Sequence, residues 1–281
     1  MFIRSLKTQL CFVLRQKTTQ AVFFLLLCLV GYNYVNNVLQ FQGMDVSNMY
    51  HPMKLLTLSY NRVYYNADIT LLFTQIYPLL VACPAGLILA REEQMKMGRL
   101  IESRMGRSTY IFSKGIAVFC ATMVVFTLPF LIEIILNMIT FPIDATRDFS
   151  HFGVYDKNYI QMVQNYWFSG MYESTPYLYA TVMTVMFGVF SGLIGVMVMS
   201  FSSIFPVRFR VMYLILPFVL LNSTIYILPE FTGGTMQHVW YKYILIFADG
   251  EKNTVAFLTI LAIIVVFNII ATIISGKKDS I

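Results

Sequence analysis

Few residues of this chain are of the types that perform catalysis or bind metals, and they lie far apart in the sequence. Metal sites use His and Cys side chains at short, regular spacings. No such spacing occurs among the three histidines and four cysteines, which are His51, His151, His238, Cys11, Cys28, Cys83 and Cys120. The sequence also has no glycine-rich nucleotide-binding loop and no dinucleotide fingerprint. We therefore expect no catalytic residue, metal or cofactor in this chain, which is predicted not to be an enzyme.

Glu92 and Glu93 form a pair of adjacent carboxylates, which suggests one specific enzyme class. Some intramembrane proteases use paired glutamates with an arginine four residues after the second. Here Met97 occupies that position, and no histidine lies in a long apolar run. The pair therefore does not predict a protease.

Glu133 is the one acidic residue well inside a long apolar run. Charged side chains within a bilayer are costly, so such a residue is a candidate for function. Asn137 follows it by one helical turn, which also allows structural pairing near the membrane interface. Proton coupling, substrate contact and structural pairing stay open for Glu133, and structural pairing is the interpretation we favour.

The elements that position these residues are apolar runs long enough to cross a bilayer. The chain is 58% hydrophobic and 12% charged, with a mean hydropathy of +0.68, which excludes a soluble globular protein. A transmembrane helix needs about 20 apolar residues, and no alternating pattern predicts a barrel. We predict an all-α integral membrane protein that forms a single transmembrane domain over residues 1–281. The six predicted spans lie near residues 20–39, 69–90, 111–138, 177–204, 211–228 and 254–275.

The distribution of charge predicts how these spans are oriented. Loops rich in Lys and Arg stay on the cytoplasmic side of a membrane. The segments on the side of both termini hold 14 of the 20 basic residues, whereas the opposite loops hold nine of the 14 acidic residues. We therefore predict a multi-pass protein of the cell membrane with both termini in the cytoplasm. The net charge of +6 then reflects topology, and we expect no nucleic-acid partner.

Two further segments are predicted to lie along the membrane surface. Residues 1–18 place apolar side chains on one helical face and basic ones on another. This pattern predicts an elbow helix that braces the transport domain, or equally a simple basic anchor. Residues 229–253 contain an apolar run too short to span, which predicts a re-entrant or interfacial segment on the outer side.

Small and polar residues within the spans predict how the helices pack. Glycines at Gly188, Gly192 and Gly195 would let another helix approach the fourth span closely. Asn33, Asn36 and Asn37 end the first span, so we expect its outer end to meet water or a cavity. Other polar side chains could line a transport pathway, although ordinary hydrogen bonds between helices would explain them as well. The pathway candidates are Gln75, Tyr77, Glu133, Asn222 and Thr224.

The segment from Arg91 to Lys114 is charged, although long apolar runs flank it on both sides. It contains six of the 20 basic residues and shows separate apolar and charged stripes at helical spacing. These stripes predict a cytoplasmic helix that inserts into a groove on a partner or lies flat on the membrane. Gly106 is expected to end this helix, and Ser108 to cap the next one. The residues expected to couple to a partner are Glu92, Glu93, Met97, Gly98, Leu100, Ile101 and Arg104.

Taken together, an amphipathic N-terminal helix, six spans, a charged loop after span two and a re-entrant-like segment before span six resemble the permease subunits of type-2 ATP-binding-cassette exporters. In that family an acidic start, a glycine and a leucine-rich helix follow span two, and a lysine opens span three. The residues that match this pattern are Glu92, Glu93, Gly98, Leu100, Ile101 and Lys114. The chain has Met105 and Gly106 where the family often has a proline, which leaves the subfamily open.

The resemblance implies a dimer of permeases, formed by a second copy or a paralogue, in the lipid bilayer. A cytoplasmic nucleotide-binding ATPase subunit would dock under each half and would bind the ATP and Mg that this chain does not. The charged helix would be the coupling helix for outward export of an amphipathic cargo such as a peptide, a lipid or a drug. Two alternatives stay open: a membrane scaffold or sensor that recruits a cytoplasmic partner, and a stand-alone proton-coupled carrier that uses Glu133.

Overall fold

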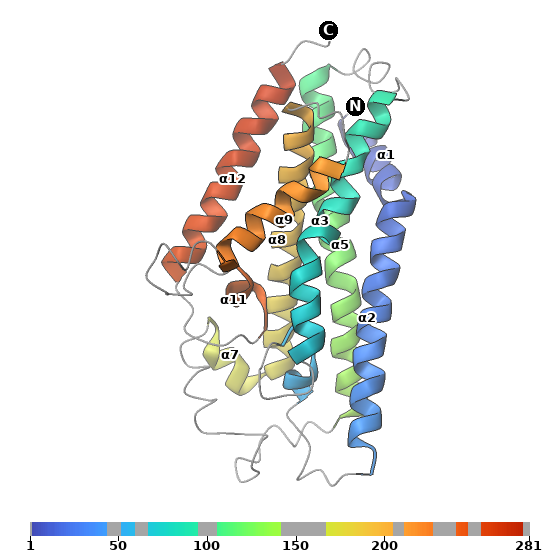
Figure 1. Cartoon of the computed structure of the whole chain (residues 1–281), viewed down its shortest axis with the longest axis vertical. Helices are drawn as coiled ribbons and strands as arrows, with labels where there is room; N and C mark the ends of the chain where they lie inside the picture. Colours follow the sequence, from blue (N-terminus) through green and yellow to red (C-terminus); the bar gives the residue numbers. More distant parts are fainter. Residues whose placement is uncertain are drawn as a thin grey trace.

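The computed structural model describes most of the chain as an all-helical bundle (Figure 1). The described residues form helices and no β-strand, in line with the predicted all-α class. They are residues 2–43, 52–59, 67–94, 106–141, 167–204, 211–226, 240–246 and 254–277.

Four helices are long and apolar enough to cross a membrane, which confirms a membrane protein of the predicted class. They are α2 (Lys17–Phe41), α5 (Arg107–Thr140), α8 (Pro176–Ile204) and α12 (Thr254–Lys277), the last qualifying over Phe257–Lys277. These helices coincide with predicted spans one, three, four and six. In lipid, a helix satisfies every backbone hydrogen bond internally, and this is why long apolar runs adopt it.

The other two predicted spans also form helices, but their described apolar parts are shorter. α3 (Ala67–Gln94) contains an apolar stretch at Leu72–Pro84, and α9 (Val211–Tyr226) has 16 residues. A full crossing needs about 20 residues. The six-span arrangement is therefore only partly supported by the described residues, which contain four helices long and apolar enough to span a membrane.

The bundle has two central helices, α5 and α8, which contact each other along their length. α3 lies on α8, α9 lies on α3, and α12 lies against both central helices. α2 packs on α5 and buries one stripe of side chains at three- and four-residue spacing. That stripe consists of Thr19, Val22, Leu26, Val30, Asn33, Asn37 and Phe41. The opposite faces of α2 and α12 expose many large apolar side chains, as expected of helices that face lipid.

Close approach of the two central helices depends on the predicted glycine stripe of α8. A Cβ added at Gly192 would lie 2.7 Å from the Phe119 ring and 3.0 Å from the Phe119 carbonyl oxygen. One added at Gly188 would overlap the Thr127 hydroxyl, and one at Gly195 would lie 2.9 Å from the Thr122 hydroxyl. These distances confirm that the glycines permit tight packing between α5 and α8.

Two short segments that do not span the bundle pack between the helix ends far from the termini. One is residues 52–59, which include the 3₁₀ turn η2 (Pro52–Leu55), and the other is residues 240–246, which include α11 (Tyr241–Ile244). The Ile246 amide donates to the Leu58 carbonyl at 3.0 Å, and the Tyr179 hydroxyl donates to the Ile246 carbonyl at 3.0 Å. The described side chains of both segments are buried. The predicted segment 229–253 thus has a buried part at 240–246, and its remainder lies outside the described residues.

The N-terminal helix and the C-terminal end of α12 lie at one end of the bundle (Figure 1). α1 (Phe2–Leu14) packs against α5 at that end. Its buried side chains are Ser5, Gln9 and Val13, whereas the apolar Ile3 is 79% exposed. The face of α1 that contacts the bundle is therefore mixed, because Leu10 and Leu14 also pack against the core, and Ile3 points outward.

Candidate functional site

Most of the predicted coupling residues lie outside the part of the chain that the structure describes. Met97, Gly98, Leu100, Ile101 and Arg104 belong to this group. Glu92 and Glu93 are described only as backbone, and both lie in the last turn of α3. The structure therefore places the start of the charged segment at the end of α3, and its helix remains a prediction.

The structure describes the end of the charged segment, which is hydrogen-bonded to the C-terminal end of α12. Gly106 has a φ of 78°, a left-handed conformation that favours glycine, and α5 begins at the next residue. The expectation that Gly106 breaks the helix fits this geometry. Arg107 Nε donates to the Ser275 carbonyl at 2.9 Å, and Ser108 Oγ donates to the Gly276 carbonyl at 3.3 Å. The predicted role of Ser108 as a helix cap is wrong, because the hydroxyl binds the end of α12 instead.

The first turns of α5 also contact α1. The Ser5 and Ser113 hydroxyls are hydrogen-bonded at 3.2 Å, and the Phe2 and Phe112 rings lie 6.0 Å apart. Lys114 was expected to open the third span, but α5 begins at Arg107, so it lies two turns inside the helix. Its ammonium donates to the Tyr110 hydroxyl at 3.2 Å. The start of α5 is therefore a junction that joins α1, α12 and the charged segment.

Tyr77, one of the pathway candidates, lies in the core of the bundle and makes a hydrogen bond between helices, which was the alternative explanation for these polar residues. It is fully buried, stacks on Trp240 with ring centroids 4.8 Å apart, and bonds its hydroxyl to the Ser191 hydroxyl at 2.9 Å. Phe126 and Phe187 also contact its ring. The residue is part of an aromatic core that holds α3, α5, α8 and the 240–246 segment together.

This assignment predicts that Tyr77→Phe is nearly silent. The substitution keeps the ring contacts and removes one hydrogen bond, which costs about 1 kcal/mol. Tyr77→Ala should instead cost about 3–5 kcal/mol, because it removes the whole ring from the core. Thermal unfolding of the purified variants measures both losses of stability. Loss of transport in Tyr77→Phe at an unchanged melting temperature would restore the pathway interpretation.

The other pathway candidates are spread over separate helices. Gln75 is half-buried on α3, and Asn222 is half-buried on α9, where both atoms of its amide lack a hydrogen-bond partner. Thr224 lies on α9, but its side chain is outside the described set. No described hydrogen bond joins these residues to Glu133. The five candidates therefore do not form one site.

Glu133 is instead the centre of a buried polar cluster. Its Oε1 accepts hydrogen bonds from Asn33 Nδ2 at 2.8 Å, from the Thr57 amide at 2.9 Å and from the Thr57 hydroxyl at 2.7 Å. The Leu55 carbonyl accepts from Asn33 Nδ2 at 2.8 Å and from Asn37 Nδ2 at 2.9 Å. The cluster therefore ties the 52–59 segment to both α2 and α5.

These contacts bear on two sequence-based expectations. Structural pairing, the favoured interpretation of Glu133, matches the observed hydrogen bonds, but its partners are Asn33 and Thr57 rather than Asn137. Asn33 and Asn37 do not reach bulk water, because both are 0% exposed and bind the 52–59 segment, whereas Asn36 is half-buried. The asparagines at the end of α2 were the sequence signal for this cluster.

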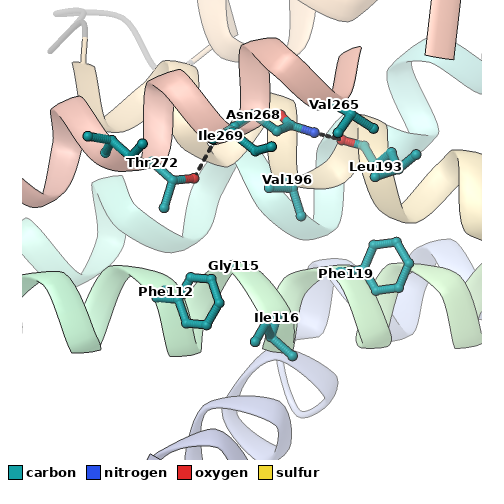
Figure 2. Close-up of a pocket in the computed structure, with 11 residues that line it drawn as sticks. Phe112, Gly115, Ile116, Phe119, Leu193, Val196, Val265, Asn268, Ile269 and Thr272 are labelled. Atoms are coloured by element: carbon teal, nitrogen blue, oxygen red, sulfur yellow. Dashed lines mark hydrogen bonds between the residues drawn. The ribbon is translucent and has the colours of Figure 1, made fainter. Parts of the chain in front are cut away.

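An apolar cavity of about 320 Å³ lies between α5, α8 and α12 (Figure 2). Phe112 and Phe119 of α5 form one wall, and Ile269 of α12 forms another. Asn268 Nδ2 donates to the Leu193 carbonyl at 3.0 Å, and Thr272 Oγ1 donates to the Asn268 carbonyl at 2.7 Å. The cavity is thus almost wholly apolar and lies in the half of the bundle near the termini.

Comparisons of this chain with protein-family models, curated proteins and solved structures find no match. The functional assignment accordingly rests on the chain's own residues and their contacts.

Proposed function

We propose that this chain is the transmembrane permease subunit of an ATP-binding-cassette exporter. In this proposal the chain is inserted in the cell membrane with both termini in the cytoplasm. A separate nucleotide-binding subunit hydrolyses ATP, and a second permease completes the transport unit. The cargo is amphipathic, and the apolar cavity between α5, α8 and α12 is a candidate place for its apolar part.

The observation that carries the proposal is the junction at the start of α5. At the end of the charged segment, Arg107 and Ser108 bind the end of α12, and Ser113 binds α1. The N-terminal end of the charged segment forms the last turn of α3. A partner that moves the charged segment would therefore displace α3, α5, α1 and α12 together, because tightly packed helices move as units.

Partner isolation is the first test of this function. The tagged chain, purified in mild detergent from its native cells, is expected to bring down a soluble nucleotide-binding subunit in near-equal amount, with ATPase activity. A chain that purifies alone or with a partner lacking ATPase activity would refute the exporter and favour the carrier or the scaffold, respectively.

Charge reversal at Glu92 and Glu93, or Leu100→Asp, should uncouple the chain from its ATPase. Charged and apolar contacts at a docking helix carry the interaction, so transport should fall by roughly tenfold or more. The spans should stay folded, because these residues precede the junction. Transport in vesicles and the melting temperature measure the two effects separately.

Asp279→Lys is a suitable control, because it reverses a charge in the C-terminal tail on the same predicted side of the membrane. It should leave both ATPase association and transport unchanged. Normal coupling in all the Glu92, Glu93 and Leu100 variants would refute the coupling-helix assignment.

A further inference from the structure

The buried cluster around Glu133 contains more hydrogen-bonding capacity than the protein itself uses. Glu133 Oε2 has no hydrogen-bond partner, and the residue is 1% exposed. The side-chain oxygens of Asn33, Asn37 and Asn137 also lack partners, and these three residues are 0% exposed. Buried polar atoms are rarely left unpaired in native proteins. Three of these oxygens belong to residues of the hydrogen-bonded cluster, and the fourth belongs to a residue one helical turn from Glu133, so together they point to a bound species.

The hydrogen bonds show which atoms of the amides are free. Asn33 Nδ2 donates to both Glu133 Oε1 and the Leu55 carbonyl, and Asn37 Nδ2 donates to the same carbonyl. Both amide orientations are thereby determined by the network, and Oδ1 is the unpaired atom in each. Asn137 lies one helical turn from Glu133 on α5, and neither of its amide atoms is engaged, so it can turn its oxygen toward Oε2.

The cluster also lacks a countercharge among the described residues. Every described contact of the Glu133 carboxylate comes from a neutral donor, namely Asn33 and Thr57. An uncompensated carboxylate at this depth in a membrane is costly. A proton or a cation must therefore neutralise it. Three donors already converge on Oε1, and the free atoms around the cluster are mainly oxygens, which is the ligand type of a hard cation.

We propose that the cluster binds a hard monovalent cation, sodium, through Glu133 Oε2 and the side-chain oxygens of Asn33, Asn37 and Asn137. A single carboxylate balances a single positive charge, and amide oxygens complete the shell without adding charge. The described residues contain no group of three His, Cys, Asp or Glu side chains, so a multivalent metal is not favoured. The bound ion would hold α2, α5 and the 52–59 segment together, independently of the proposed transport function.

The test compares the melting temperature of the purified full-length protein in sodium chloride and in N-methyl-D-glucamine chloride at equal ionic strength. We expect sodium to raise the melting temperature by several degrees and to saturate, because a ligand that binds only the folded state stabilises it. Equal melting temperatures in the two salts would overturn the proposal and assign the neutralising charge to a proton.

Two variants and a control localise the effect. Asn137→Leu removes a ligand that makes no other hydrogen bond, so the protein should fold and lose at least most of the sodium-dependent shift. Glu133→Gln should abolish the shift. Thr184→Val alters another buried hydroxyl without a partner, elsewhere on α8, and should keep the full shift. A sodium effect that persists in Asn137→Leu would show that sodium acts elsewhere and would overturn the proposal, even if Glu133→Gln fails to fold.

Discussion

Glu133→Ala is expected to destabilise the protein by about 3 kcal/mol or more, because it removes the shared acceptor of three buried hydrogen bonds. The substitution leaves the Thr57 amide, the Thr57 hydroxyl and one bond of Asn33 Nδ2 without their acceptor. Each unsatisfied buried donor costs about 1–3 kcal/mol. The lost hydrogen bonds all lie where the 52–59 segment meets α2 and α5. This segment should therefore separate from the two helices before the bundle unfolds.

Hydrogen–deuterium exchange measures this local release directly. Amides in residues 53–59 should exchange faster in Glu133→Ala, whereas amides in the centre of α8 should keep their protection. Glu133→Gln is the matched comparison, because it retains a carbonyl acceptor for the Thr57 and Asn33 donors and should lose less stability. Unchanged exchange in Glu133→Ala would show that the cluster does not hold the segment.

Gly192→Val is expected to force α5 and α8 apart at the centre of the bundle. Even the Cβ atom would lie 3.0 Å from the Phe119 carbonyl oxygen, which is backbone and cannot rotate away. Overpacking of this kind costs about 1–3 kcal/mol, and valine adds two further carbons to the clash. A lower melting temperature and a smaller monodisperse fraction in detergent are the expected results.

Gly31→Val on α2 is the matched control for this substitution. An added Cβ at Gly31 meets no atom within 4 Å, so the same change in the same helical context should be tolerated. If the two variants unfolded at the same temperature, close approach through Gly192 would not stabilise the bundle.

Much of the helical framework could be predicted from the sequence. Each predicted span corresponds to a helix, and the structure adds only a few residues to most of their ends. The glycine stripe at Gly188, Gly192 and Gly195 also predicted a close helix contact, because small side chains at helical spacing form a flat face. Both signals are local patterns, since they depend on residues within one helix.

The partners of individual polar side chains could not be predicted in the same way. Glu133 was linked with its neighbour Asn137, but its hydrogen bonds reach Asn33, 100 residues away, and Thr57, 76 residues away. Tyr77 was a pathway candidate, yet the tertiary structure places it in an aromatic core against Trp240. In both cases the partners of the side chain depended on which face of each helix turns toward the core of the bundle.

The sequence by itself determined that the chain is an all-α membrane protein, and it located the helices. The physical reason is that lipid cannot hydrogen-bond the backbone, so every long apolar run must become a helix wherever it packs. Only the tertiary structure decided that α5 and α8 are central, that the start of α5 joins α1 and α12, and that Glu133 binds Asn33 and Thr57. These features depend on how neighbouring helices are rotated and aligned against each other. Side-chain packing determines that arrangement, and it cannot be read from sequences that are apolar on nearly every face.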